Sequence, residues 1–332
     1  MRIDVPISEA WAAVCNQYRA ALPYDTSTYH VQIYLGYQHA LQEIAGSMAK
    51  LFAHKKTIAF VENADPAFVP VAVAFSEENY TIKSLTRADL DQPAAWIDPA
   101  QRELLFIVAA EDDPVTGRIH DLTALRASLK DKRIFLITVS HALHKMGPLA
   151  KPGPYEARIL SLGPDRALMI GGDRCRVGPS LAQRLPWRPE NDTEIAKSLA
   201  PHDPATLEKW QKAITDFEKS LPAGFSRYFD ENAARVYDRA VFFHPGLDGL
   251  SLITELASQL SVSIPSIGEP APLETTSPCR WENPRFTDWL TRGGESEEKV
   301  RGLALIAAEK LGPALTTQLA AAAAKIEKLQ NG

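Results

Sequence analysis

Residues 166–180, RALMIGGDRCRVGPS, combine an apolar run with two glycines and a basic turn. Gly171 and Gly172 would let backbone N–H groups converge where a side chain would block them. Arg174 adds a planar fork of N–H donors that suits an oxyanion. This chemistry fits a phosphate or a carboxylate group. The alternative, which these residues alone favour, is a sheet-edge turn whose arginines pair with neighbouring carboxylates.

Cys175 lies between two arginines, Arg174 and Arg176. Nearby cations stabilise a thiolate, so this cysteine could be reactive. A buried and inert thiol is the favoured alternative.

Two histidines, His141 and His144, have the spacing of metal ligands on a helix. No third ligand with a spacing rule accompanies them, so we predict no metal site. His141 is therefore either a ligand contact or a structural histidine.

Asp112 and Asp113 are adjacent to each other in the sequence and could act as a general acid and base. Carboxylates before a proline, however, usually stabilise a turn.

The composition is that of a globular protein, with 332 residues, 45% hydrophobic and 23% charged. A formal charge of −5 gives no basic surface for nucleic acid, so a small molecule or another protein is the expected partner. The three cysteines form no CxxC pair. We find neither a signal-like leader nor an apolar run that could span a membrane, and we expect a cytoplasmic protein without membrane contact.

Apolar strands alternate with amphipathic helices along the first part of the chain. Strands rich in Ile, Val and Phe, without polar alternation, indicate a parallel sheet covered on both faces. The expected elements are a helix at 37–53, strands at 57–61, 80–85 and 104–109, a helix at 121–132 and a strand at 133–140.

The next two strands, 157–162 and 166–172, are too close for a crossover helix and should form an antiparallel hairpin. The predicted fold class is therefore α/β, a mixed and mostly parallel sheet sandwiched by helices, with a small C-terminal α+β domain. The small domain should start with the segment 239–246 and hold a helix at 247–260, a short strand at 262–265 and a terminal helical pair within 297–329. The expected limits are 1–35 for an N-terminal arm and helix of the small domain, 36–235 for the large domain with a bridging helical region from 183, and 236–332 for the small domain.

The order of these segments resembles fold type I pyridoxal-phosphate (PLP) enzymes, the aminotransferase and cysteine desulfurase group. YLGYQHALQEIAGSMAKLFAHKKTIAFVENADPAF is similar to the family's early segment, and DDPVTGRIHDLTALRASL to its N-P-x-T-G turn and helix. RIFLITVSHA resembles the strand that usually reads V-D-E-A-H. ARILSLGPDRALMIGGDRCRVGPSL resembles the segment that carries the cofactor lysine, and WLTRGGESEEKVRGLALIAAEKL the small-domain ending.

The resemblance places the Schiff-base lysine of the family at Arg174 and the histidine before it at Asp173. A Schiff base needs a neutral amine, and a guanidinium stays protonated. No lysine occurs between Lys151 and Lys197, so a shift of a few residues does not supply one. If Arg174 occupies the lysine position of the family, we expect it to project into a water-poor cleft, where an anion or an internal acid such as Asp113 or Asp173 neutralises it.

The other cofactor positions implied by the resemblance also differ. The aspartate that pairs with the pyridinium nitrogen falls at Thr138 or Val139. The phosphate turn falls at residues 63–66, in which Asp65 brings a negative charge and Pro66 lacks a backbone donor. The remaining candidate contacts are Asn63 and Ala64 of that turn, Asp113 and Thr116 of the 113–117 turn, His141, and Arg292 or Arg285 for a substrate carboxylate, with Trp281 and Trp289 as small-domain core.

The sequence therefore predicts an aminotransferase-like pseudoenzyme without covalent PLP, acting as a binding, regulatory or partner subunit. Its expected assembly is a homodimer, or a heterodimer with an active relative, which could hold a small anionic ligand. One alternative is an active enzyme that holds PLP, pyridoxamine phosphate or another phosphorylated ligand non-covalently, with Arg174 in the site. Another is an unrelated chemistry on the same kind of sheet.

Overall fold

The computed structural model divides the chain into two compact units. The first comprises residues 1–111 and 120–201, and the second comprises 112–119 and 202–332. The structure describes residues 9–25, 27–51, 56–61, 68–97, 104–129, 134–147, 151–163, 166–175, 192–260 and 296–330.

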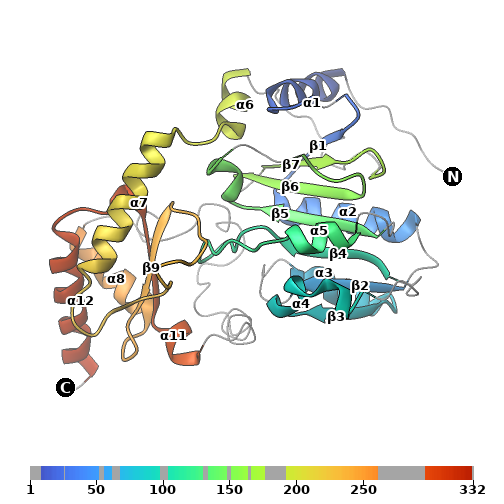
Figure 1. The fold of residues 1–332 in the computed structure, drawn as a ribbon. Helices are drawn as coiled ribbons and strands as arrows, with labels where there is room; N and C mark the ends of the chain where they lie inside the picture. Colours follow the sequence, from blue (N-terminus) through green and yellow to red (C-terminus); the bar gives the residue numbers. More distant parts are fainter. Residues whose placement is uncertain are drawn as a thin grey trace. The chain divides into compact units, whose positions relative to one another are not determined.

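A seven-stranded sheet forms the centre of the first unit, in the order β1-β7-β6-β5-β4-β2-β3 (Figure 1). β7 pairs antiparallel with both of its neighbours, and the other strands run parallel to one another. This confirms the mixed, mostly parallel sheet. The strands are β1 (His30–Tyr34), β2 (Thr57–Val61), β3 (Thr81–Leu85), β4 (Leu104–Ala110), β5 (Phe135–Ser140), β6 (Glu156–Gly163) and β7 (Arg166–Gly171).

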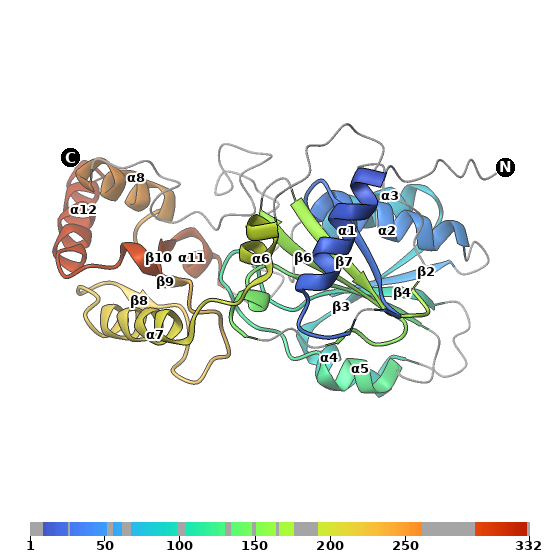
Figure 2. The same ribbon diagram turned by 90° about the horizontal axis from the view of Figure 1, so that it is seen from above.

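Helices cover both faces of this sheet (Figure 2). α2 and α3 lie on one face, and α4 and α5 lie on the other. α1 and α6 pack together over the β1–β7 end, where Tyr18 and Ile195 share a core with Leu168. The helices are α1 (Glu9–Ala21), α2 (Tyr37–Leu51), α3 (Phe68–Glu77), α4 (Arg87–Asp91), α5 (Thr123–Leu129) and α6 (Asp192–Leu199).

The structure confirms the helix and the strands that the apolar residues of this unit predict. α2 buries Leu41, Ile44 and Met48 on one side, as the three- and four-residue spacing requires. β4 is buried along its whole length, which explains its lack of polar alternation. The predicted hairpin is also present, because β6 and β7 pair antiparallel.

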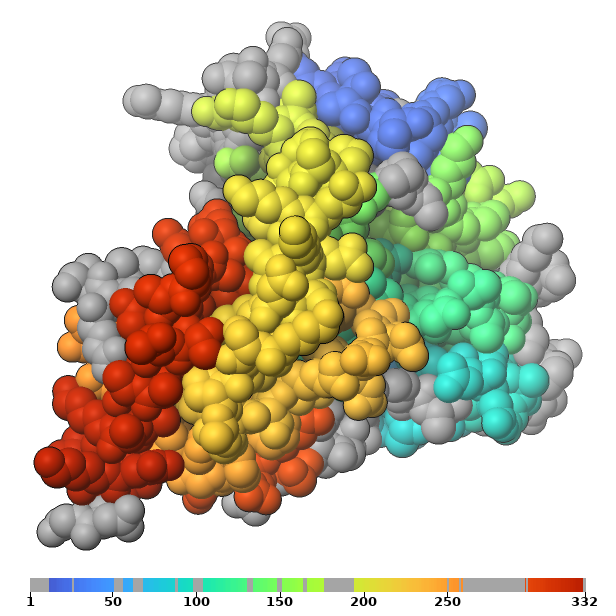
Figure 3. Space-filling model, turned by 60° about the vertical axis from the view of Figure 1, so that its left-hand side comes forward, coloured from blue at the N-terminus to red at the C-terminus, as the bar shows by residue number. Residues whose placement is uncertain are grey.

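The second unit is built on a three-stranded antiparallel sheet, β10-β9-β8. Ile214 and Phe217 of α7 join Phe242 and Leu319 in one core. The outer surfaces of α7 (yellow) and α12 (red) are seen in Figure 3. The elements are α7 (Pro204–Lys219), β8 (Ser226–Arg227), β9 (Arg239–Phe243), α8 (Gly249–Leu260), α11 (Glu297–Arg301), β10 (Leu303–Ala307) and α12 (Leu315–Gln330).

The prediction of a terminal helical pair is wrong, because β10 separates α11 from α12. The segment 303–307, LALIA, has ample helix propensity, but it pairs with β9 along its whole length. Gly302 permits this path, since a Cβ there would lie 2.1 Å from the carbonyl oxygen of His244. A cross-strand pairing therefore overrides the local helical preference.

The compact units also differ from the predicted domain limits. α1 and the edge strand β1, which the sequence did not predict as a strand, belong to the first unit rather than to the small domain. The expected bridging region is split, since α6 belongs to the first unit and α7 to the second. The apolar side of α7 packs on the smaller sheet, so burial decides its membership.

Candidate functional site

The carboxyl ends of the parallel strands meet at one edge of the large sheet. Ligands of open α/β sheets bind outside this edge. Gly36 follows β1 at this edge, and His141 follows β5. The rings of His141 and Tyr37 meet edge-on with centroids 4.7 Å apart, and both side chains are buried. His141 is thus a sequence-predicted residue that the structure places at the carboxyl edge of the sheet.

The N-terminus of α2 lies at the same edge. Gly36 has φ 81°, a left-handed conformation that turns the chain from β1 into the helix. The Gly36 carbonyl oxygen accepts the first helical hydrogen bond, from Ala40 N at 3.1 Å. The first turn carries no acidic residue, so its N–H groups could receive an anion. This turn was not among the predicted sites. The glycine in YLGYQ, between a strand and a helix, is the feature of the sequence that indicates it.

Ser161 adds a buried hydroxyl near His141. Ser140 and Leu160 are the last partners across β5 and β6, and His141 and Ser161 are the residues that follow them in the chain. Ser161 is 5% exposed, and its hydroxyl has no hydrogen-bond partner within the described part of the chain. A buried hydroxyl without a partner costs free energy, and a polar ligand group would offset that cost.

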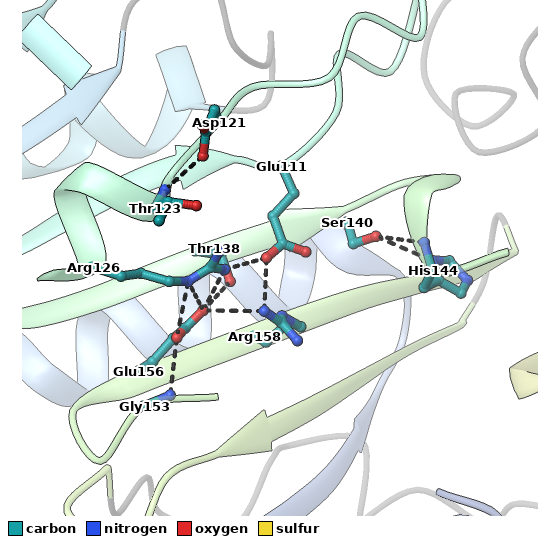
Figure 4. A network of polar contacts seen from close by, with 10 residues as sticks. All are labelled: Glu111, Asp121, Thr123, Arg126, Thr138, Ser140, His144, Gly153, Glu156 and Arg158. Carbon is teal, nitrogen blue, oxygen red and sulfur yellow. Dashed lines mark hydrogen bonds and ion pairs between the residues drawn. The ribbon is translucent and has the colours of Figure 1, made fainter. Parts of the chain in front are cut away.

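The turn after β5 is held by hydrogen bonds to Ser140 (Figure 4). Ser140 Oγ accepts from His144 N at 3.1 Å and lies 3.2 Å from His144 Nδ1. Lys145, the next residue, donates from Nζ to the carbonyl oxygen of Lys197 at 3.0 Å. Burial lowers the pKa of Lys145 to about 8. His144 therefore has a structural hydrogen bond, and no cluster of metal ligands occurs among the described residues.

A charge network lies across β4, β5, β6 and α5 (Figure 4). Arg158 Nη2 is 2.9 Å from Glu111 Oε1, and Arg126 Nη2 is 2.8 Å from Glu156 Oε1. Arg126 also contacts Glu111. The charges of the two arginines balance those of the two carboxylates, as a buried charge network requires. The sequence prediction did not include this network. The feature that indicates it is the presence of charged residues at the start of an otherwise apolar strand, as in EARILSL.

The network sets the ionisation of its most buried carboxylate. Burial alone would raise the pKa of Glu156, but hydrogen bonds and charge from Arg126 and Arg158 outweigh it and lower the pKa below its ordinary value. Gly153 N also donates to Glu156 Oε2 at 3.0 Å.

Thr138 bonds to this network. Its hydroxyl donates to Glu156 Oε1 at 3.1 Å, and the side chain is fully buried. Of the two positions that the resemblance gives to the pyridinium partner, Thr138 thus holds a neutral hydroxyl bonded to an internal carboxylate, and Val139 is apolar.

The glycine and arginine turn of 171–174 lies at the opposite edge of the sheet. It follows the antiparallel strand β7, and Arg174 N donates to the carbonyl oxygen of Pro154, before β6 begins. A Cβ at Gly172 would lie 2.0 Å from the carbonyl oxygen of Gly153, and one at Gly171 would lie 2.9 Å from that of Cys175. Close backbone packing therefore explains both glycines.

Arg174 does not lie in a water-poor environment, so that expectation is wrong. Its side chain is 67% exposed and lies 3.8 Å from Asp173, which is the sheet-edge pairing given above as the alternative. The reason is strand direction, because β7 runs against its neighbours and delivers its C-terminal turn to the amino edge. Cys175 is buried, which raises the pKa of its thiol to about 12 and confirms the alternative of a buried thiol.

Asp113 and Thr116 belong to the second unit and build a turn. Asp113 Oδ1 accepts from the backbone N–H groups of Val115 and Thr116, both at 2.8 Å. Gly117 completes the turn with φ 76°. Arg239 Nη1 donates to the carbonyl oxygens of residues 114 and 115, at 2.8 Å and 3.0 Å. These contacts are the turn chemistry expected for a carboxylate before a proline.

The remaining predicted positions lie outside the described residues. They are Asn63, Ala64, Asp65, Pro66, Arg176, Trp281, Arg285, Trp289 and Arg292, together with the short strand expected at 262–265. None of the helices described is both long and apolar enough to cross a bilayer.

Solved structures share this architecture at low sequence identity. A NifS-like protein from Rickettsia africae superposes with a TM-score of 0.66 at 13% identity, over 96% of this chain and 88% of that one. The cysteine desulfurase CsdA from Escherichia coli gives 0.63 at 14% identity, over 97% and 85%. The histidinol-phosphate aminotransferase from Clostridium acetobutylicum gives 0.58 at 10% identity, over 98% and 91%.

No protein-family model and no curated protein matches the chain. Identity in this range shows the fold and leaves activity to the residues of the site. The match extends over nearly the whole chain, and it therefore includes the seven-stranded sheet with β7 as the one antiparallel strand among those described. This chain has the fold of the fold type I PLP enzymes, the architecture shared by cysteine desulfurases and aminotransferases.

Proposed function

We propose that this protein is a PLP-enzyme-like subunit that forms no Schiff base and works by binding a ligand or a partner chain. The observation that carries the proposal is the absence of lysine between Lys151 and Lys197, a span that includes β6, β7 and their turn. Without a lysine amine on this hairpin, covalent capture of the aldehyde of PLP has no nucleophile there.

Among the described residues of the first unit, Lys145 is a lysine that lies just after a parallel strand, β5, at the carboxyl edge of the sheet. Its lowered pKa would favour the neutral amine that a Schiff base requires. Its Nζ, however, is bonded to backbone carbonyl oxygens at the end of α6, including that of Lys197. These bonds hold the amine away from a cofactor, so we assign Lys145 a structural role.

The carboxylates near Thr138 support the same proposal. The pyridinium nitrogen of PLP requires an acidic partner if the ring is to act as an electron sink. Glu111 and Glu156 are the acids adjoining this part of the sheet, and both are paired with arginines. The residues present therefore do not suit covalent PLP chemistry.

The test is reductive trapping. The purified chain is mixed with PLP, treated with borohydride and digested for mass spectrometry, with the desulfurase CsdA as a positive control. We expect a phosphopyridoxyl lysine in CsdA and none at a stoichiometric level in this chain. A stoichiometric adduct on Lys145, or on any other single lysine, would refute the proposal.

A second candidate function is non-covalent binding of a phosphorylated ligand at the N-terminus of α2. The left-handed Gly36 and the first-turn amides of α2 favour it, as does the Ser161 hydroxyl, which has no hydrogen-bond partner among the described residues. Calorimetric titration with pyridoxamine phosphate should then show saturable binding that Ser161→Ala weakens. Absence of binding would contradict this second function, and the partner-subunit role would then be the one that stands.

The proposed assembly is a homodimer or a heterodimer with an active relative. Closed two-fold dimers are the commonest assemblies of soluble proteins. Light scattering of the purified chain should give twice the mass of one chain if it pairs with itself. A monomer that binds no active relative at working concentrations contradicts a partner role.

A further inference from the structure

The turn after β5 is fixed to its own strand on one side. Residues 141–147 include the short 3₁₀ helix η2 (Leu143–Lys145) and begin with His141. Ser140 Oγ accepts from His144 N, and Met146 N donates to the carbonyl oxygen of Leu143 at 2.9 Å. These bonds make the turn a compact body at the carboxyl edge of the sheet.

Lys145 fixes the turn on its other side, to the end of α6. Its Nζ donates to the carbonyl oxygens of Lys197 at 3.0 Å and Ala200 at 3.3 Å, and also to that of Ser198. The last carbonyls of a helix have no intrahelical partner, and a cation near them is favourable. One ammonium group thus engages three carbonyl oxygens from a segment more than 50 residues away in sequence.

The segment that Lys145 holds leads into one of the three places where the chain passes between the two units. α6 ends at Leu199, the first unit ends at Pro201, and the second unit resumes at His202. The lysine therefore joins the turn carrying His141 to the chain that leads into the other unit.

We propose that Lys145 is a positioning residue that makes the turn 141–147 and the connection at 197–201 move as one body. A displacement of either segment is then transmitted to the other through a single side chain. This coupling does not depend on whether a ligand binds at the carboxyl edge. It differs from ordinary helix capping, in which loss of the lysine would loosen the helix end only.

Hydrogen exchange of the full chain at pH 7, followed by mass spectrometry, separates the two cases. Lys145→Met should speed exchange by about tenfold in peptides covering both 141–147 and 196–201, because the charged hydrogen bonds that link the two segments are lost. Lys197→Met is the matched control. It removes an exposed lysine from the same helix end and keeps the backbone carbonyl, so exchange in both segments should stay unchanged.

A variant on the acceptor side tests the same coupling from the other end. Ala200→Pro removes the N–H that donates to the carbonyl oxygen of Ala196 and displaces the end of α6. If the proposal holds, exchange in 141–147 also rises, although this turn is unaltered. This variant decides the question if Lys145→Met unfolds the chain. Faster exchange in only one of the two segments in either variant, or no change in Lys145→Met, would overturn the proposal.

Discussion

Arg158 Nη2 lies 2.9 Å from Glu111 Oε1, and both side chains are buried in the large sheet. The arginine is the third residue of β6, and the carboxylate follows the last residue of β4. This pair fixes the relation between two strands that have β5 between them. Its removal should therefore affect folding before it affects any binding.

Arg158→Met should lower the free energy of unfolding by about 3 kcal/mol, because it leaves part of a buried negative charge without its partner. Urea denaturation followed by circular dichroism measures this. Arg174→Ala is the control, since Arg174 is largely exposed and its loss should change stability by no more than about 0.5 kcal/mol. Equal effects of the two substitutions would contradict the structural role of the network.

The stability of the first unit should depend on the ionisation of Glu156. The folded state lowers the pKa of Glu156 below its ordinary 4.5, so the unfolded chain binds this proton more readily than the folded chain. The ionised group therefore stabilises the fold above that ordinary value, and the contribution is lost as the pH falls through the lower folded pKa. Urea unfolding of the wild type and Glu156→Gln should differ most above about pH 5 and converge in stronger acid. A difference that does not change with pH would show that the charge of Glu156 contributes nothing.

Gly172→Ala should destabilise the protein by about 3 kcal/mol, since the added Cβ would lie 2.0 Å from the carbonyl oxygen of Gly153, a backbone atom that cannot rotate away. Gly46→Ala provides the opposite case. Nothing lies within 4 Å of a Cβ at this position in α2, so alanine should stabilise the helix by about 0.5–1 kcal/mol. Thermal unfolding measures both. A neutral Gly172→Ala would contradict the packing role given to the GG pair.

Cys175 should resist alkylation in the native protein, because burial raises the pKa of its thiol to about 12 and the thiolate is the reactive form. Iodoacetamide treatment at pH 8 with peptide mass spectrometry should modify Cys175 on the order of a hundredfold or more slowly than in urea-unfolded chain. Cys15, which is partly exposed, is the internal reference. Rapid native labelling of Cys175 would place this thiol in a reactive environment.

The sequence by itself determined the elements whose pattern is local. The apolar runs of β2, β4 and β5, the amphipathic face of α2 and the short separation of β6 and β7 each depend on residues close in sequence. They were predicted correctly because periodicity and turn length act within one segment. The absence of lysine from 152 to 196 is also a property of the sequence alone.

The tertiary structure decided where the candidate residues lie. Arg174 and His141 both follow apolar strands, but β7 runs antiparallel and places Arg174 at the amino edge, while β5 places His141 at the carboxyl edge. The pairing of Glu111 with Arg158 and the seating of Lys145 at the end of α6 join segments tens of residues apart. Such contacts depend on strand direction and burial across the fold, which no local pattern encodes, and they determine which charged residues are free to meet a ligand.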